Sequence, residues 1–217
     1  MPEGLIETAA QATAPEERRI YGVTVAQVIN NIDSTGQGRV QIYLPWLPSM
    51  QPWARVAVLD AGMNRGTYFI PQIGDEVLVA FNHGDVREPY VIGGLWNGQD
   101  RPPALLPTDS VNKRIIRTPL GHEIEFDDAL QSITISTTTQ QKITIDPTSI
   151  KLSTTGSTAS VTLDTVGTVS IQAATSIELK APSITIQGTS VDIQGAGTTS
   201  IKGGTLCEIQ GSLVKIN

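Results

Sequence analysis

The side chains that could carry out acid–base chemistry are few and scattered. Two adjacent acidic pairs, Asp75-Glu76 and Asp127-Asp128, could serve catalysis if their carboxylates converged on a cleft. Neighbours along a strand point to opposite faces, so we expect each pair to be a turn or a solvent-exposed acidic stretch instead. The sequence therefore predicts no catalytic site and no enzyme activity.

Metal ligands are equally sparse. His83, beside Gly84-Asp85, has no second His or Cys nearby, so a zinc site there would lack ligands and a turn is favoured. His122 could form a ring of three in a trimer, an alternative that stays open. The single cysteine, Cys207, has no intrachain disulfide partner; it stands two residues before Ile209 and is expected to be a buried thiol. We expect no cofactor and no metal.

Composition favours an all-β protein. The 217 residues include 20 Gly, 13 Pro and long runs of Thr, Ser, Val and Ile, which suit strands and turns. The formal net charge of −6 argues against nucleic acid as a main partner. The N-terminus lacks a signal pattern and no long apolar run is present, so we expect synthesis in the cytoplasm without a signal peptide.

The chain changes character near residue 126. Every aromatic residue lies at or before Phe126, and large rings usually fill part of a globular core. Two regions must therefore bury their surfaces differently. The predicted divisions are an N-terminal arm (1–19), a small barrel (20–100), a Pro-rich linker and neck (101–126), and a repetitive rod (127–217).

Five strands with turn residues between them are expected in the barrel region. Five short strands in about eighty residues suit a small closed barrel. The predicted strands are Tyr21–Asn30, Arg39–Leu44, Ala54–Leu59, Glu76–Phe81 and Tyr90–Leu95.

The rod region repeats pairs of aliphatic residues two positions apart, which places both side chains on one face of a strand. A strand with two medium side chains cannot offset the ordering of its backbone alone, so neighbours must complete the burial. A single-chain solenoid and three chains wound together are both possible. We favour the trimer, because the last residues stay in strand register without a capping element. The expected trimer core residues are Ile171, Ile177, Ile186 and Ile193.

Several stretches resemble the OB-fold domain of phage baseplate assembly protein V and of VgrG-like spikes of contractile injection systems. The matching segments are Gly36–Ile42, Trp53–Ala57, Pro71–Phe81 and Pro89–Gly93. The neck 121–128 and the aliphatic pairs look like the start of that family's triple-stranded β-helix. The resemblance implies an OB-fold barrel followed by an intertwined trimeric β-helix rod.

The same resemblance implies a function. The chain would be the structural central spike of a contractile tail or injection system baseplate, a homotrimer that caps the tube and punctures the target envelope, touching the membrane only transiently. Its partners would be itself, a separate baseplate hub protein and a PAAR-type tip protein, within a virion or injection particle. Tip binding is expected at Val214, Lys215, Ile216 and Asn217, where unpaired strand edges invite another chain.

Two alternatives stay open. One is a trimeric fibre or adhesin that holds out a receptor-binding end. The other is an OB-fold module that binds oligosaccharide or nucleic acid, because such barrels often offer aromatic platforms. Tyr43 and Trp46 are the candidates for such a platform, with Arg39 and Arg55 as the nearby basic residues.

Overall fold

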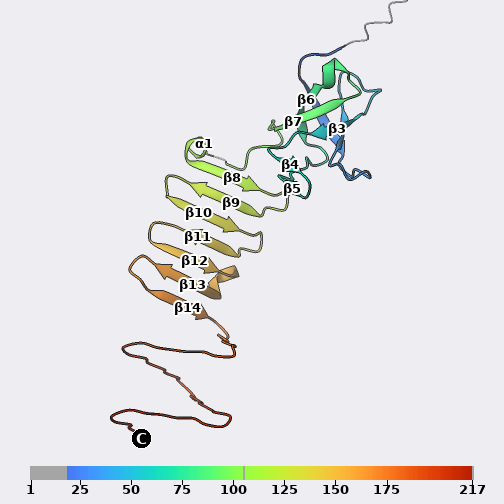
Figure 1. Cartoon of the computed structure of the whole chain (residues 1–217). Helices are drawn as coiled ribbons and strands as arrows, with labels where there is room; N and C mark the ends of the chain where they lie inside the picture. Colours follow the sequence, from blue (N-terminus) through green and yellow to red (C-terminus); the bar gives the residue numbers. More distant parts are fainter. Residues whose placement is uncertain (1–18, 105, 217) are drawn as a thin grey trace, which may run out of the picture.

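The computed structural model describes residues 19–104 and 106–216. Figure 1 shows three parts in chain order: a small barrel, a seven-stranded sheet, and an extended stretch that runs to the C-terminal end. The predicted arm 1–19 lies outside the described residues except for Arg19. The all-β fold class is confirmed, since the only helical segments described are single turns.

The barrel is a closed sheet in the order β1-β2-β3-β7-β6. Neighbouring strands are antiparallel except β3 and β7, which run parallel. The five predicted strands are confirmed with slightly different ends. They are β1 (Thr24–Asn30), β2 (Val40–Tyr43), β3 (Trp53–Val56), β6 (Glu76–Phe81) and β7 (Pro89–Leu95).

The barrel core follows from alternation along these strands. In β6, for example, Val77, Val79 and Phe81 point inward and are buried, whereas the residues between them are half-buried on the outside. Every core side chain is at most 8% exposed. Closure of the sheet therefore buries the aliphatic residues of the barrel within one chain. The core residues are Ala26, Val28, Val40, Ile42, Leu44, Ala54, Val77, Val79, Phe81 and Val91.

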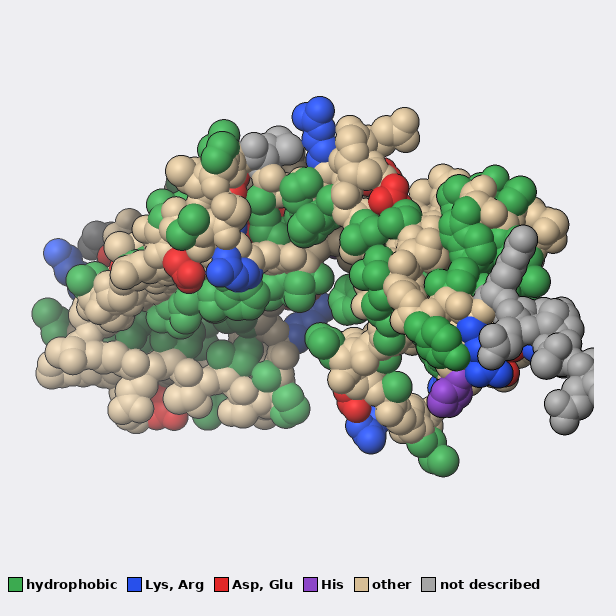
Figure 2. Space-filling model, turned by 90° about the horizontal axis from the view of Figure 1, so that it is seen from above, with side chains coloured by type: hydrophobic (Ala, Val, Ile, Leu, Met, Phe, Trp, Pro, Cys, Tyr) green, Lys and Arg blue, Asp and Glu red, His purple; other side chains and the backbone are tan. Residues whose placement is uncertain are grey.

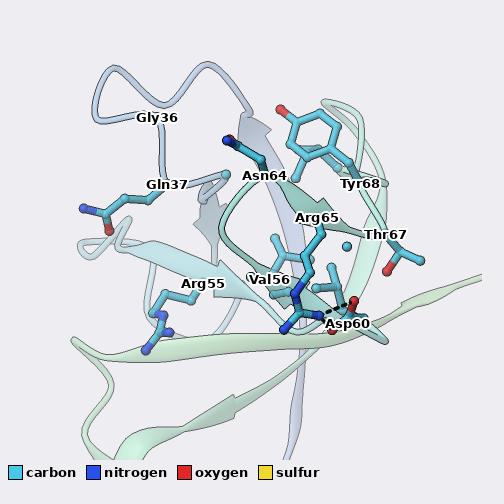
Figure 3. A pocket seen from close by; sticks show the side chains of 15 residues that line it. Gly36, Gln37, Arg55, Val56, Asp60, Asn64, Arg65, Thr67 and Tyr68 are labelled. Atoms are coloured by element: carbon cyan, nitrogen blue, oxygen red, sulfur yellow. Dashed lines mark hydrogen bonds and ion pairs between the residues drawn. The ribbon is translucent and has the colours of Figure 1, made fainter.

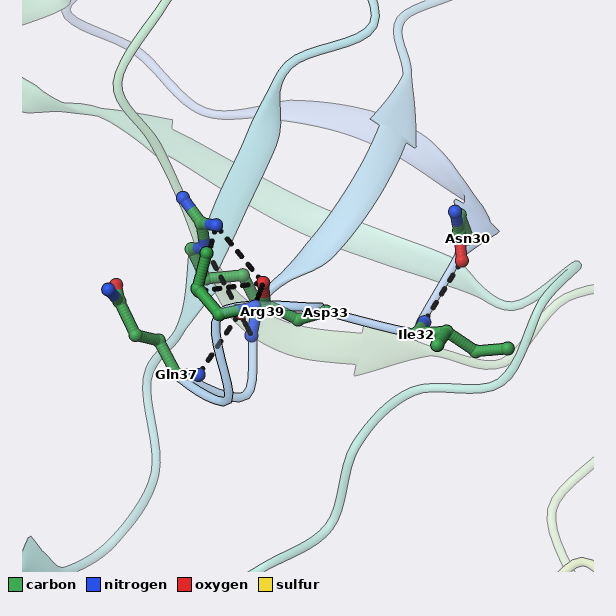
Figure 4. A network of polar contacts seen from close by, with 6 residues as sticks. Asn30, Ile32, Asp33, Gln37 and Arg39 are labelled. Carbon is green, nitrogen blue, oxygen red and sulfur yellow. Dashed lines mark hydrogen bonds and ion pairs between the residues drawn. The ribbon is translucent and has the colours of Figure 1, made fainter.

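A polar loop joins β1 to β2 and is organised by one carboxylate. Asp33 accepts hydrogen bonds from the backbone N–H groups of Thr35, Gln37 and Arg39 at 3.0, 3.2 and 3.2 Å. The Arg39 guanidinium adds two more, at 3.1 and 3.0 Å (Figure 4). These bonds fix the turn that sets the register between the two strands.

A small hairpin follows β3 where the sequence predicted only a turn. Its strands are β4 (Ala61–Gly62) and β5 (Arg65–Gly66), and they pair with each other alone. A 3₁₀ turn, Asn82–Gly84, and later a helical turn α1 (Asp109–Asn112) are the short helical segments on either side of β7. None of the helical segments in the described parts of the chain could cross a membrane.

The second sheet is an antiparallel meander in the order β14 to β8. Each strand is joined to the next by a tight connection, one of which contains the 3₁₀ turn Thr155–Ser157. The strands are β8 (Lys113–Arg117), β9 (Glu123–Asp127), β10 (Ser132–Ser136), β11 (Lys142–Ile145), β12 (Ser149–Ser153), β13 (Ala159–Asp164) and β14 (Val169–Ala173).

From Ala174 to Ile216 the chain contains no assigned strand, and all its residues are exposed. Figure 1 shows it as wide zigzag passes that continue the direction of the sheet but lie further apart than the strands β8–β14. The repeat region thus has two architectures. The sequence analysis favoured intertwined chains throughout the repeat. In the structure, residues 132–173 instead pair within one chain, because short turns let adjacent strands form hairpins.

Candidate assembly surface

One face of the seven-stranded sheet carries two columns of apolar side chains, defined by the strand register. Residues directly opposite across a ladder share a face and pack side by side. The first column is Ile116, Ile124, Ile135, Ile143, Leu152, Val161 and Ile171. The second column is Phe126, Ile133, Ile145, Ile150, Leu163 and Val169.

These columns are left largely uncovered within one chain. Apart from the half-buried Val161, their members are between 36 and 62% exposed. Figure 2 shows hydrophobic side chains gathered along a hollow in the half of the molecule that contains the sheet. A continuous exposed apolar surface of this kind marks an interaction site in soluble proteins.

The chain begins to cover the first column itself just after β14. A groove of about 560 Å³ is lined by column members and by Ser176 and Ile177 from the first extended pass. The structure therefore brings together two of the four predicted core residues, Ile171 and Ile177. The other two, Ile186 and Ile193, lie further along the zigzag and are 68 and 66% exposed.

The opposite face of the sheet is polar. Along each strand, one polar residue stands between the members of the two apolar columns and points to the other face. These residues form one row: Glu125, Thr134, Thr144, Lys151, Thr162 and Ser170. Threonine suits this position because it is β-branched and polar, so it fits a strand facing water. The sheet is thus amphipathic, with its apolar face available for contact.

An ion-pair cluster closes the barrel-proximal end of the sheet. The Lys113 Nζ lies 3.3 Å from Glu125 Oε2 and 3.6 Å from Asp127 Oδ2. The hydrogen bond to Glu125 raises the pKa of Lys113. Asp127 is buried at the end of β9, so the expectation of a turn or an exposed acid was wrong for this residue, and it also accepts the Leu130 backbone N–H at 2.9 Å. Sequence reasoning missed this cluster, although Glu125 and Asp127 alternate with Ile124 and Phe126 in a pattern that could have shown it.

The predicted tip-binding residues lie at the far end of the zigzag. Val214 and Ile216 are 48 and 87% exposed, and Lys215 is exposed as well. Asn217 lies outside the described residues. Among those that are described, residues 214–216 have no partner strand.

The residues considered for acid–base or metal chemistry do not converge. Asp75 accepts the Gln72 backbone N–H at 2.8 Å in a turn, and His83 stands at φ +47° in a 3₁₀ turn. His122 lies at the neck. Cys207 lies in the zigzag and is exposed in the single chain, where the sequence predicted a buried thiol, because no strand of this chain covers that stretch. Within residues 19–104 and 106–216, no three His, Cys, Asp or Glu side chains gather to hold a metal ion.

Of the two residues of the proposed aromatic platform, Tyr43 is half-buried at the end of β2, and Trp46 packs on the barrel itself. The Trp46 indole N–H donates to Thr24 Oγ1 at 2.9 Å, and its ring meets Phe81 edge-on with centroids 6.4 Å apart. Arg39 is held by Asp33 and lies over the Trp53 ring at 5.6 Å. Arg55 lies over Tyr90 at the same distance. These contacts favour a structural role for the rings.

The barrel matches a known protein family, and segments of 102 to 129 residues of this chain are similar to known spike proteins. Residues 24–96 match the type VI secretion system/phage-baseplate injector OB domain. The chain is 30% identical over 129 residues to the type VI secretion system spike protein VgrG2a of Pseudomonas aeruginosa, covering 53% of this chain and 15% of that protein. It is 32% identical over 102 residues to the spike protein VgrG3 of Vibrio cholerae, covering 42% of this chain and 10% of that protein.

A third relative is the actin cross-linking toxin VgrG1 of Vibrio cholerae, which is 33% identical over 102 residues, or 42% of this chain and 9% of that protein. This chain therefore spans only a small part of the length of these relatives. The resemblance to VgrG-like baseplate spike proteins is nevertheless confirmed, and it is strongest in the barrel, where residues 24–96 match the type VI secretion system/phage-baseplate injector OB domain.

Proposed function

We propose that this chain is a structural spike subunit of a contractile injection baseplate, and that three copies form its rod. The extended stretch 174–216 carries the proposal. Its aliphatic pairs are exposed, and its passes have no partner strands among the described residues. Fixing such a backbone costs about 1–2 kcal/mol per residue, a cost that pairing and burial must offset.

Partner strands from other copies would offset this cost. The passes of the zigzag lie further apart than the strands of the sheet (Figure 1), as expected if strands from two further copies interleave with them. In the preceding sheet, the two apolar columns would face a common axis. Three copies would then bury a continuous apolar core from β9 to the far end of the zigzag, with the threonine-rich face in water.

A rod of this kind suits a mechanical task. The hydrogen bonds between neighbouring strands run parallel to the long axis of the rod, and all three chains share its core. A force along that axis is therefore distributed over many contacts. We propose that it punctures a target envelope as part of an injection particle, by mechanical action rather than by catalysis. The similarity to spike proteins supports this assignment.

We also propose the partners that the resemblance implies. A baseplate hub protein would bind on the barrel side, and a PAAR-type tip protein would cover the three copies of residues 214–217. Exposed edges with unpaired N–H and C=O groups, as residues 214–216 present, invite such a cover. Deletion of Leu213–Asn217 should remove tip binding in a pull-down while the oligomer remains folded.

Light scattering of the purified full-length chain tests the central proposal. We expect the mass of three copies and resistance of the oligomer to detergent, because dissociation would expose every aliphatic pair. A folded monomer at micromolar concentration would contradict the proposal. Of the alternatives, a glycan array and a DNA-binding assay test the OB-fold binding module, and neither should give a signal.

A further inference from the structure

Two apolar patches on the barrel remain exposed and have no role in the proposed rod. The hairpin patch consists of Leu59, Met63, Tyr68 and Phe69, which are between 62 and 95% exposed. The strand patch consists of Val25 in β1, Leu78 in β6, and Ile92 and Gly93 in β7. Val25 and Ile92 are 41 and 45% exposed, and Leu78 is half-buried.

The hairpin patch is held in a defined shape. Arg65 Nη1 donates to both carboxylate oxygens of Asp60, at 2.7 and 2.8 Å, and the Thr67 backbone N–H donates to the Asp60 carbonyl at 3.0 Å. Gly66 adopts φ +133°, and a Cβ there would collide with the Asp60 backbone. A rigid loop loses little entropy on docking, so its exposed tip is prepared for a contact.

The hairpin also stands away from the barrel wall. A groove of about 670 Å³ separates it from β3 and from the loop at Gly36–Gly38. Figure 3 shows Arg65 reaching back to Asp60, with Asn64 and Tyr68 on the same side of the loop. The turn of the hairpin, with Met63 92% exposed, therefore projects from the barrel, and Leu59, which is 95% exposed, lies just before the first hairpin strand.

The strand patch is flat, whereas the hairpin projects. Val25 pairs with Leu78, and Leu78 pairs with Gly93, so the three lie in one row on the outer surface of the barrel. An added Cβ at Gly93 would meet nothing within 4 Å, and Gly93 does not adopt a positive φ. The pairing shifts here, with Leu78 opposite Gly93 but Val79 opposite Val91, so Gly93 stands beside a β-bulge. A glycine in such a place leaves the strand backbone open to a close approach by another chain.

In the proposed trimer, cyclic symmetry of order three would account for two different patches on one barrel. A three-fold ring is built from a heterologous contact, in which one surface of each copy meets a different surface of the next copy. The projecting hairpin and the flat strand patch form such a pair. The hairpin and the exit of β7, which carries Gly93, both lie on the side of the barrel toward the sheet (Figure 1).

We propose that the hairpin patch of each copy packs against the strand patch of the next copy, over Gly93, and so joins the three barrels into a ring. This inference rests on the proposed trimer. It assigns the barrel an assembly contact separate from the rod, with a second copy of this chain as the partner. The glycine lets Met63 and Leu59 of the neighbour approach the strand backbone.

Thiol labelling of the full-length oligomer tests this contact. Met63→Cys is made in a Cys207→Ser background, and modification of the introduced thiol by a maleimide is timed before and after denaturation. We expect labelling of the native oligomer to be slower by about tenfold, which corresponds to about 1.4 kcal/mol of docking free energy. Adding Gly93→Gln should restore fast labelling, because the larger side chain blocks the strand patch. Gly98→Gln is the matched control, since Gly98 is also open and has no positive φ.

The outcomes separate this contact from the trimer itself. A trimer by light scattering in which the introduced thiol is labelled as fast as in the denatured chain would overturn the ring contact and leave the rod proposal intact. Protection that appears only in the assembled particle would overturn it too, because the occupant would then be another baseplate protein. Equal protection in the Gly93→Gln and Gly98→Gln variants would show that the strand patch is not the partner surface. A monomer would overturn both proposals.

Discussion

The barrel and the rod use similar aliphatic residues in opposite ways. In the barrel, Val28, Ile42 and Val79 are at most 1% exposed because the sheet closes on itself. In the rod, Ile143, Leu152 and Leu163 occupy strands of equal regularity and are about 40% exposed. The same side chains are therefore buried by the topology of one chain in the first region and, in the proposed trimer, only by other chains in the second.

This difference shows what alternation along a strand does and does not determine. A period of two decides which face is apolar, but it does not decide what covers that face. The barrel covers its apolar face by closing five strands around it, and Phe81 is the aromatic residue of that core. The rod region has no aromatic residue after Phe126 and pairs only with its own neighbours in sequence, so its apolar face stays open.

The largest expected effect comes from a charge in the zigzag. Ile186→Asp should abolish the trimer, because three carboxylates would enter an apolar core at one level without partners. The neighbouring Thr185→Asp, at a position expected on the opposite face, is the control and should assemble normally. The readout is the mass by light scattering. Equal yields of trimer from the two variants would break the distinction between inward and outward residues.

A cavity in the barrel should act on that region alone. Ile42 is fully buried, so Ile42→Ala should lower the free energy of unfolding of the barrel by about 2–5 kcal/mol, while the rod keeps its assembly. Ile145→Ala, at a rod position that is 42% exposed, should leave the barrel transition unchanged. Calorimetry with separate transitions provides the measurement. A shift of both transitions in both variants would mean that the two regions unfold as one unit.

Much of this fold could be predicted from the sequence, for reasons visible in particular residues. The five barrel strands were predictable because Gly-Asp turns separate alternating segments. The aliphatic pairs two positions apart predicted that one face of the second sheet would be apolar. The hairpin β4–β5 was missed because two-residue strands held by Asp60 and Arg65 leave no periodic signal. The boundary between the self-paired sheet and the zigzag was also missed, since the pairs Val169/Ile171 and Ile177/Leu179 look alike in sequence.

A turn in the self-paired sheet offers a smaller and more local test. Gly167 stands at φ +90° in the connection between β13 and β14. Gly167→Ala should destabilise the sheet by about 1 kcal/mol, the usual cost of a left-handed conformation for a residue with a Cβ. Gly98→Ala, at an open glycine with no positive φ, should cost nothing measurable. Thermal unfolding followed by circular dichroism checks both. Equal melting temperatures for the two variants would contradict the turn assignment.

The smallest expected effect is a pH dependence confined to the barrel. The Arg39 guanidinium and the N–H donors of the loop hold the pKa of Asp33 well below its ordinary value of 3.8. A depressed pKa in the folded state contributes stability that is present above about pH 4 and is lost as the pH falls further. The barrel transition should therefore fall between pH 4 and pH 2, and Asp33→Asn should be less stable at pH 7 but flatter across that window. Asp60→Asn, which removes the solvent-exposed pair with Arg65 in the hairpin β4–β5, should leave the barrel transition unchanged, because the pair shapes the hairpin locally and exposed pairs add little to global stability. Unfolding curves from pH 7 to pH 2 would decide the point, and identical slopes for wild type and Asp33→Asn would show that this carboxylate does not stabilise the barrel.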